Sequence, residues 1–232
     1  MDKRVHLFFD LDHTLWDFEV NSRLALRELF EVFKMESLGV PSFEAFLKVY
    51  EFENEKAWAL YREGKMKKEV LRTIRFKKAL EVFNASDSAL EGKLASAYLT
   101  ISPYKTALIP GTIDLLEYLK AKEYPMHILT NGFEEVQGIK MEHSGLSPYF
   151  DHVITSEFIG VQKPDPKAFL GSAKHVGAHL ETSYMIGDNL IADVLGAKKV
   201  GMNEVYFNPM ADEHDHELKY EITSLLELKS IL

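Results

Sequence analysis

The chain has 232 residues, of which 46% are hydrophobic and 27% charged, so it can bury the core of one large domain, or of a domain with a smaller companion, and its composition excludes disorder. Its 27 basic and 36 acidic side chains give a formal net charge of −9, which argues against a protein that binds the phosphate backbone of nucleic acids. Cysteine is absent, which excludes disulfides, thiolate zinc sites and cysteine nucleophiles.

The first predicted element is a strand. Residues 5–9 form a continuous apolar run that ends at Asp10, which is typical of a strand buried on both faces of a parallel sheet. This run is too short for a signal peptide, and no stretch approaches the roughly 20 apolar residues of a membrane helix. We therefore expect a cytoplasmic protein that does not associate with membranes.

The segment from about residue 19 to residue 98 repeats apolar side chains at helical spacing. It predicts four helices and no strand, with apolar positions that fall within 20–33, 43–50, 70–74 and 90–98. Turn residues around Gly39, Gly64 and Asn84 separate these helices.

From residue 112 onward, helices alternate with short apolar strands. We expect helices at 112–122, 133–143, 166–176 and 190–199, and strands at 126–130, 153–156, 184–187 and 204–207. Asp165 followed by Pro166 is a helix start signal. The alternation indicates an α/β fold with a doubly wound parallel sheet, whose ligands bind at the carboxyl ends of the strands.

The spacing of the strands indicates an inserted domain. A strand–helix–strand unit needs about 30 residues, whereas 118 positions separate Asp12 from Thr130. We therefore predict a core made of residues 1–16 and 105–232, interrupted by an all-helical cap at 17–104.

Four polar motifs follow the predicted strands. They are Asp10-Leu11-Asp12-His13-Thr14, Thr130-Asn131-Gly132, Lys163-Pro164-Asp165-Pro166, and Gly187-Asp188 with Asp193 five residues further on. Because the carboxyl ends of parallel strands share one edge of the sheet, we expect these motifs to form one site. Several carboxylates this close repel one another unless a divalent cation lies among them, and oxygen ligands alone favour Mg²⁺.

The residue types fit the hydrolysis of phosphate esters, which needs a positioned nucleophile and dense positive charge. Asp10 is the candidate nucleophile, and Asp12 is the candidate acid and base that protonates the leaving oxygen and later activates water. The Thr130 hydroxyl and the N–H groups of Asn131 and Gly132 are expected to bind the phosphoryl oxygens.

The remaining motif residues are expected to balance charge. Lys163 neutralises the phosphoryl group and the nucleophile, and Asp188 binds the metal. Asp193 orients Lys163 or accepts a hydrogen bond from a metal-bound water.

This ordered set of motifs resembles the haloacid dehalogenase superfamily, in the phosphatase branch that carries a helical, C1-type cap after the first strand. The resemblance spans essentially the whole chain. It implies a Rossmann-like core, dependence on Mg²⁺, a phospho-aspartyl intermediate on Asp10, and metal ligands from Asp10, Asp188 and the backbone carbonyl of Asp12.

Two segments carry a finer resemblance. Residues 9–18 and 129–133 are similar to the pyrimidine 5′-nucleotidase subgroup, which implies that the small phosphorylated metabolite bound here is a nucleoside monophosphate. His13 occupies a position where most of the superfamily has glycine, and we interpret it as a marker of this subgroup. Trp16 and Phe18 are expected to line the substrate pocket, or else to form the hinge of the cap.

Other functions share these motifs. A phosphatase of another small phosphometabolite, a sugar phosphomutase and a non-catalytic binder of phosphorylated ligands stay open. A haloacid dehalogenase is disfavoured because the resemblance implies that dehalogenases lack an acidic residue at the position of Asp12. The sequence does not predict the oligomeric state.

Overall fold

The structure, a computed structural model, describes residues 4–232. It divides into two compact units. One contains the described residues up to Phe18 together with Thr106–Leu232, and the other is Glu19–Lys105. The boundaries predicted from the sequence, at 16/17 and 104/105, lie two residues and one residue away from these.

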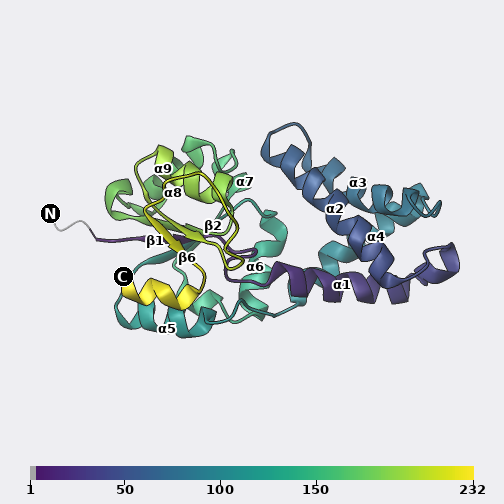
Figure 1. The fold of residues 1–232 in the computed structure, drawn as a ribbon, viewed down its shortest axis with the longest axis horizontal. Coiled ribbons are helices and arrows are strands. Elements are labelled where there is room, and N and C mark those ends of the chain that lie inside the picture. The colour runs from purple at the N-terminus through teal and green to yellow at the C-terminus, as the bar shows by residue number, and fades with distance from the viewer. Residues whose placement is uncertain (1–3) are drawn as a thin grey trace. The chain divides into compact units, whose positions relative to one another are not determined.

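The first unit contains a six-stranded sheet (Figure 1). Its strands are β1 (Leu7–Phe9), β2 (Met126–Thr130), β3 (His152–Thr155), β4 (Tyr184–Gly187), β5 (Asn203–Phe207) and β6 (Tyr220–Ile222), in the order β3-β2-β1-β4-β5-β6. All neighbouring strands are parallel, and Phe9 lies opposite Ile128 on one side and Ile186 on the other. The predicted doubly wound α/β fold is therefore confirmed, and the chain reverses its winding direction beside β1.

Helices cover both faces of this sheet (Figure 1). They are α5 (Thr112–Ala121), α6 (Glu134–His143), α7 (Ser156–Ile159), α8 (Pro166–Val176) and α9 (Gly196–Lys199), with the π-helix η5 (Leu190–Leu195) and the 3₁₀ turns η3 (Ser147–Tyr149), η4 (Leu180–Thr182) and η6 (Leu225–Ser230). As predicted, Pro166 opens α8, and the Asp165 carboxylate caps that helix by accepting a hydrogen bond from the Lys167 N–H at 2.8 Å.

The core forms because successive strand residues point to opposite faces. Leu7 and Phe9 lie in a hydrophobic cluster with residues of α5, α6 and η6, whereas Phe8, between them, packs with residues of α8 and α9. β1 is thus apolar on both faces and carries no polar side chain until it ends at Asp10. The first polar residue after β1 is therefore held at the carboxyl edge of the sheet.

The second unit is helical. Its helices are α1 (Phe18–Val32, whose first residue belongs to the first unit), α2 (Phe43–Arg62), α3 (Lys68–Glu81) and α4 (Ser88–Ile101), with 3₁₀ turns η1 (Met35–Leu38) and η2 (Ser102–Tyr104). These helices share a hydrophobic cluster of their own, built from residues 25–98. No helix within residues 4–232 is both long enough and apolar enough to cross a membrane.

The two segments that connect the core to the insertion run side by side. Trp16 and Leu108 form an antiparallel bridge. The Asp17 N–H donates to the Ala107 carbonyl at 3.0 Å, and the Ile109 N–H donates to the Leu15 carbonyl at 2.9 Å. The chain therefore leaves and re-enters the core at one place, directly after the first polar motif.

Candidate active site

Three carboxylates converge at the carboxyl edge of the sheet. Asp10 follows β1 and Asp188 follows β4, while Asp193 lies in η5. Each offers an oxygen within 4.8 Å of the others. Burial, the largest influence, raises the pKa of Asp10 to about 7 and that of Asp188 to about 6, and it also raises the pKa of Asp193. Repulsion within the group adds to each rise, so the cluster holds more negative charge than the protein compensates.

Lys163 is the cation of this cluster. Its side chain is 2% exposed, and its ammonium group lies 2.7 Å from Asp10 Oδ1 and 2.6 Å from Asp193 Oδ1. It also donates to the Leu129 carbonyl at 2.6 Å. Burial lowers the pKa of Lys163, but the two carboxylates raise it by more, so the net direction is upward. Lys163 therefore stays charged and touches the candidate nucleophile, and Asp193 lies where it can orient the ammonium group.

The turn after β1 is tightly hydrogen-bonded. The N–H groups of Leu15 and Trp16 both donate to the Leu11 carbonyl, and His13 adopts a left-handed conformation with φ of 67°. Glycine tolerates such a φ better than histidine does, so the backbone at this position would accept glycine with less strain. Thr14 joins this turn to β4, because its hydroxyl donates to Asp188 Oδ1 at 2.9 Å and accepts from the Asp188 N–H at 3.1 Å.

The loop after β2 contacts the Lys163 segment. The Asn131 side chain donates to the Lys163 carbonyl and accepts from the Lys163 N–H, both at 2.9 Å. Its amide is therefore engaged with the backbone. The Thr130 hydroxyl accepts from the Gly132 N–H at 3.0 Å, so in this conformation that N–H points at Thr130. The structure thus brings Thr130 and Asn131 to the edge that carries Asp10, but the Gly132 N–H already has an acceptor within the loop.

Gly187 is required by close packing. A Cβ atom at this position would lie 2.3 Å from Asp193 Oδ2, far inside van der Waals contact. The same Asp193 oxygen accepts a hydrogen bond from the Asn189 N–H at 3.1 Å. Any larger residue at 187 would displace the carboxylate that contacts Lys163.

The donor set fits a hard divalent cation. Three carboxylates face one ammonium group, so up to two negative charges are left uncompensated, and all the candidate ligand atoms are oxygens. Among residues 4–232, no other group of three or more acidic or histidine side chains brings its ligand atoms this close together. The cluster therefore fits the predicted Mg²⁺, because Asp10, Asp188 and Asp193 offer carboxylate oxygens close enough to share one ion.

Asp12 has a partner that the sequence did not predict. Its Oδ1 atom lies 2.6 Å from the ammonium group of Lys140, which comes from the last turn of α6. In the sequence, Lys140 is one helix lysine among many, 128 positions from Asp12, so no motif marks it.

The two aromatic residues after the turn differ in burial. Trp16 is 1% exposed and belongs to the hydrophobic cluster of the core, where Lys140 Nζ lies 4.2 Å from the centroid of its ring. Phe18 is partly buried against the same cluster and stacks at a tilt on His13, with 4.7 Å between ring centroids. Trp16 is thus placed to support Lys140, whereas Phe18 keeps some exposed surface beside the turn.

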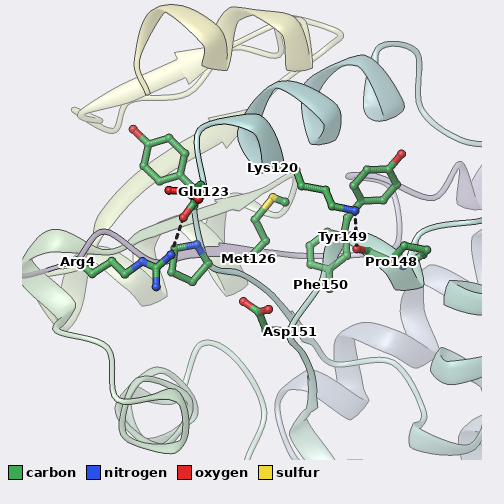
Figure 2. Close-up of a pocket in the computed structure, with 10 residues that line it drawn as sticks. Arg4, Lys120, Glu123, Met126, Pro148, Tyr149, Phe150 and Asp151 are labelled. Atoms are coloured by element: carbon green, nitrogen blue, oxygen red, sulfur yellow. Dashed lines mark hydrogen bonds between the residues drawn. The ribbon is translucent and has the colours of Figure 1, made fainter.

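A separate pocket of about 280 Å³ lies at the other end of the sheet (Figure 2). Its lining includes Met126, the first residue of β2, and Asp151, which precedes β3. Figure 2 shows Arg4 and Lys120 on opposite sides of it, where they donate to the carbonyl oxygens of Glu123 and Pro148. Because the carboxylate cluster lies at the carboxyl ends of the strands, this pocket is not part of the candidate active site.

The comparisons with known proteins agree with the chemistry that the site suggests. The sequence model of haloacid dehalogenase-like hydrolases matches residues 6–201. Pyrimidine 5′-nucleotidase PynA of Streptococcus pneumoniae is 31% identical over 229 residues, which cover 97% of this chain and 94% of PynA. Glyceraldehyde 3-phosphate phosphatase of Methanothermobacter thermautotrophicus is 29% identical over 236 residues, with coverage of 97% and 98%.

A solved structure is similar over the full length. The crystal structure of the HAD-hydrolase YfnB of Bacillus subtilis, determined with bound magnesium, superposes with a TM-score of 0.89 at 29% identity. The match covers 99% of both chains, so it includes the sheet and the helical insertion alike.

Proposed function

Because the chain belongs to the family of haloacid dehalogenase-like hydrolases, we propose that it is a Mg²⁺-dependent phosphomonoesterase that acts through an aspartyl-phosphate on Asp10 and prefers nucleoside 5′-monophosphates. The observation that carries the proposal is the contact of Asp10 with Lys163 inside a cluster of three carboxylates. The finer statement about the substrate rests on the similarity to PynA and on the motifs at residues 9–18 and 129–133.

The first half-reaction uses Asp10 as nucleophile. A carboxylate oxygen of Asp10 attacks phosphorus, the bond from phosphorus to the ester oxygen breaks, and Asp12 gives a proton to the departing oxygen. Lys163, 2.7 Å from Asp10 Oδ1, offsets negative charge on the nucleophile and on the phosphoryl group. Thr130 lies at the same edge, where its hydroxyl can donate to a phosphoryl oxygen.

The second half-reaction restores the enzyme. Asp12 takes a proton from water, the water oxygen attacks the phosphorus of the aspartyl-phosphate, and inorganic phosphate leaves as the Asp10 carboxylate is regenerated. When bound to Asp10 and Asp188, Mg²⁺ would supply positive charge for the phosphoryl oxygens. Asp193, through its contact with Lys163 at 2.6 Å, holds the ammonium group between both carboxylates.

A second substrate class has specific support. The relative from Methanothermobacter thermautotrophicus is a glyceraldehyde 3-phosphate phosphatase and matches nearly the whole chain, so a small sugar phosphate is the alternative substrate. A phosphomutase and a non-catalytic phosphate binder would use the same cluster, and both differ from a phosphatase in releasing no stoichiometric phosphate.

The test measures inorganic phosphate released from UMP, dUMP, dTMP, glyceraldehyde 3-phosphate and other sugar phosphates in the presence of Mg²⁺. We expect the highest kcat/KM with the pyrimidine nucleotides, loss of activity in EDTA, and a loss of at least about 10³-fold in Asp10→Asn. Asp215→Asn, at an exposed site, is the matched control. Full activity of Asp10→Asn would reject the mechanism, and preference for the sugar phosphates would favour the alternative substrate.

A further inference from the structure

Lys140 is a buried cation that the proposed mechanism does not use. It lies in the last turn of α6 and is 5% exposed. Its ammonium group contacts Asp12 Oδ1 at 2.6 Å and lies 4.2 Å from the centroid of the Trp16 ring and 5.9 Å from that of Phe18. The contact joins a charged lysine to Asp12, the candidate acid and base, which lies outside the Lys163 cluster.

The backbone around Asp12 is already fixed. The Leu15 and Trp16 N–H groups bind the Leu11 carbonyl, and the His13 N–H donates to the Trp16 carbonyl at 3.0 Å. The freedom left to Asp12 is rotation of its side chain. From these contacts we propose that Lys140 is a positioning residue, which holds the Asp12 carboxylate in one orientation for proton transfer; this role rests on the phosphatase function proposed above.

Packing alone does not account for a lysine at this position. A buried ion pair loses as much by desolvation as it gains by attraction, and an apolar residue of similar size often stabilises a fold equally well. Trp16, below the ammonium group, belongs to a hydrophobic cluster that would accept an apolar chain. The positive charge is therefore matched to the carboxylate and to the face of the indole ring.

The helix also connects two parts of the site. α6 begins at Glu134, directly after the loop 131–133 that follows Thr130 at the end of β2. Gln137 packs so closely against Gly132 in this loop that a Cβ there would lie 1.8 Å from Gln137 Nε2. Lys140 follows Gln137 by one turn on this helix. One rigid element thus sets the position of Asp12 relative to the loop that is proposed to bind phosphate.

The experiment separates orientation of Asp12 from direct binding of substrate. kcat/KM is measured with Mg²⁺ for a series of phosphate monoesters, from p-nitrophenyl phosphate, whose leaving group needs no proton, to alkyl phosphates, whose leaving group does. This ratio reports the steps up to departure of the alcohol and excludes hydrolysis of the aspartyl-phosphate. The variants are Lys140→Met, Lys140→Arg and the control Lys174→Met, at an exposed position of α8.

We expect Lys140→Met to lose about 10- to 100-fold in kcat/KM on alkyl phosphates and less than about threefold on p-nitrophenyl phosphate, because proton donation by a positioned acid contributes on the order of 10²-fold or more. Lys140→Arg should recover most of the loss, and Lys174→Met should match the parent chain. Thermal unfolding of each variant shows whether it is folded.

A double mutant identifies the residue through which Lys140 acts. If Lys140 works through Asp12, Asp12→Asn with Lys140→Met should be no slower than Asp12→Asn alone, within about twofold. Additive losses, or a loss of equal size on every ester, would overturn this role and leave the phosphatase function intact. A parent chain that releases no phosphate from any ester would overturn the proposed function and this role with it.

Discussion

Asp188 lowers the stability of the fold while it contributes a carboxylate to the candidate metal site. Its carboxylate is buried beside that of Asp10. Burial raises the pKa of Asp188, and repulsion by the Asp10 carboxylate raises it further, to about 6. A carboxyl group whose pKa is higher in the folded than in the unfolded state weakens the fold above the unfolded pKa, because there the unfolded chain releases the proton more readily. Near neutral pH, the cluster without metal is therefore a local source of instability.

Asp188→Asn should relieve that repulsion and keep the hydrogen bond from the Thr14 hydroxyl, since an amide oxygen also accepts. In EDTA we expect its free energy of unfolding to exceed that of the parent by about 1 kcal/mol. Added Mg²⁺ should raise the Tm of the parent and not that of the variant. Thermal unfolding with and without Mg²⁺ checks this, with Asp215→Asn as control; an equal Mg²⁺ shift in parent and variant would remove Asp188 from the metal site.

At the scale of single residues, sequence and structure agree where a motif is local. Asp10, Asp12, Thr130, Lys163 and Asp188 each lie at the end of a predicted strand or after it, and the parallel sheet brings these ends to one edge. Whether each plays its proposed part in the reaction stays a prediction. The sequence did not identify Lys140 as a site residue, because its contact with Asp12 spans 128 positions and no motif spacing reveals it.

Secondary-structure elements were predictable in proportion to their length and apolar pattern. The helices expected at 112–122, 133–143 and 166–176 and the first five strands lie within two residues of the expected bounds. In the insertion the four helices are present as expected, but α2 and α3 extend several residues beyond the apolar positions that indicated them, and the short helix α7 was not predicted. The strand β6 was not predicted because Tyr220–Ile222 is only three residues long and has a glutamate at its centre. It also follows a polar loop, with no helix between β5 and β6. The predicted helix at 190–199 is instead a π-helix followed by one turn of α-helix, with Asp193 in the widened part, where the sequence signal is the same as for an ordinary helix.

A row of three histidine rings runs from His6, just before β1, through His127 on β2 to His152 on β3. His127 is 2% exposed, and its Nε2 atom lies 2.9 Å from His6 Nδ1. The centroid of its ring lies 5.4 Å from that of the His152 ring. Burial, and then the neighbouring histidines, lower the pKa of His127 to about 3. The folded protein therefore keeps this ring neutral, whereas the unfolded chain protonates it below about pH 6.5. Its contribution to stability is complete above that pH and is lost as the pH falls toward 3.

His127→Leu should flatten the acid side of the stability curve. Between pH 6.5 and 5 we expect His127 to account for about 2 kcal/mol of the decrease in the free energy of unfolding of the parent, which the variant lacks. Denaturant unfolding at pH 7 and pH 5 measures this, and His216→Leu, in an exposed loop, is the control. Parallel pH dependence in the parent and His127→Leu would contradict the assignment.

On the scale of the whole molecule, the two units have separate cores. The two hydrophobic clusters of the sheet contain residues of the first unit alone, and the cluster of the helical unit contains residues of Glu19–Lys105 alone. The insertion was predictable because its helices interrupt an otherwise regular alternation. The substrate was not, because the motifs describe a phosphate and a metal and say nothing of the alcohol.

Replacement of Glu19–Lys105 by a short glycine-rich turn should therefore leave a foldable core. Trp16 and Leu108 already lie in an antiparallel bridge, so the turn has little distance to span. We expect a single cooperative unfolding transition and a far-ultraviolet spectrum with α/β character, checked by circular dichroism with denaturant. A non-cooperative transition would show that the core depends on the insertion.

The paired amide of Asn131 has a consequence for how the site meets its substrate. Its two hydrogen bonds to the backbone of Lys163 close a ring, much as two bases pair, between loops from different strand–helix units. Neither loop can shift without the other, so the hydroxyl and ammonium groups they carry keep their spacing before any ester arrives. The site therefore needs little reorganisation during the reaction. Dipoles that are oriented in advance lower the free-energy barrier, because no free energy is used to align them.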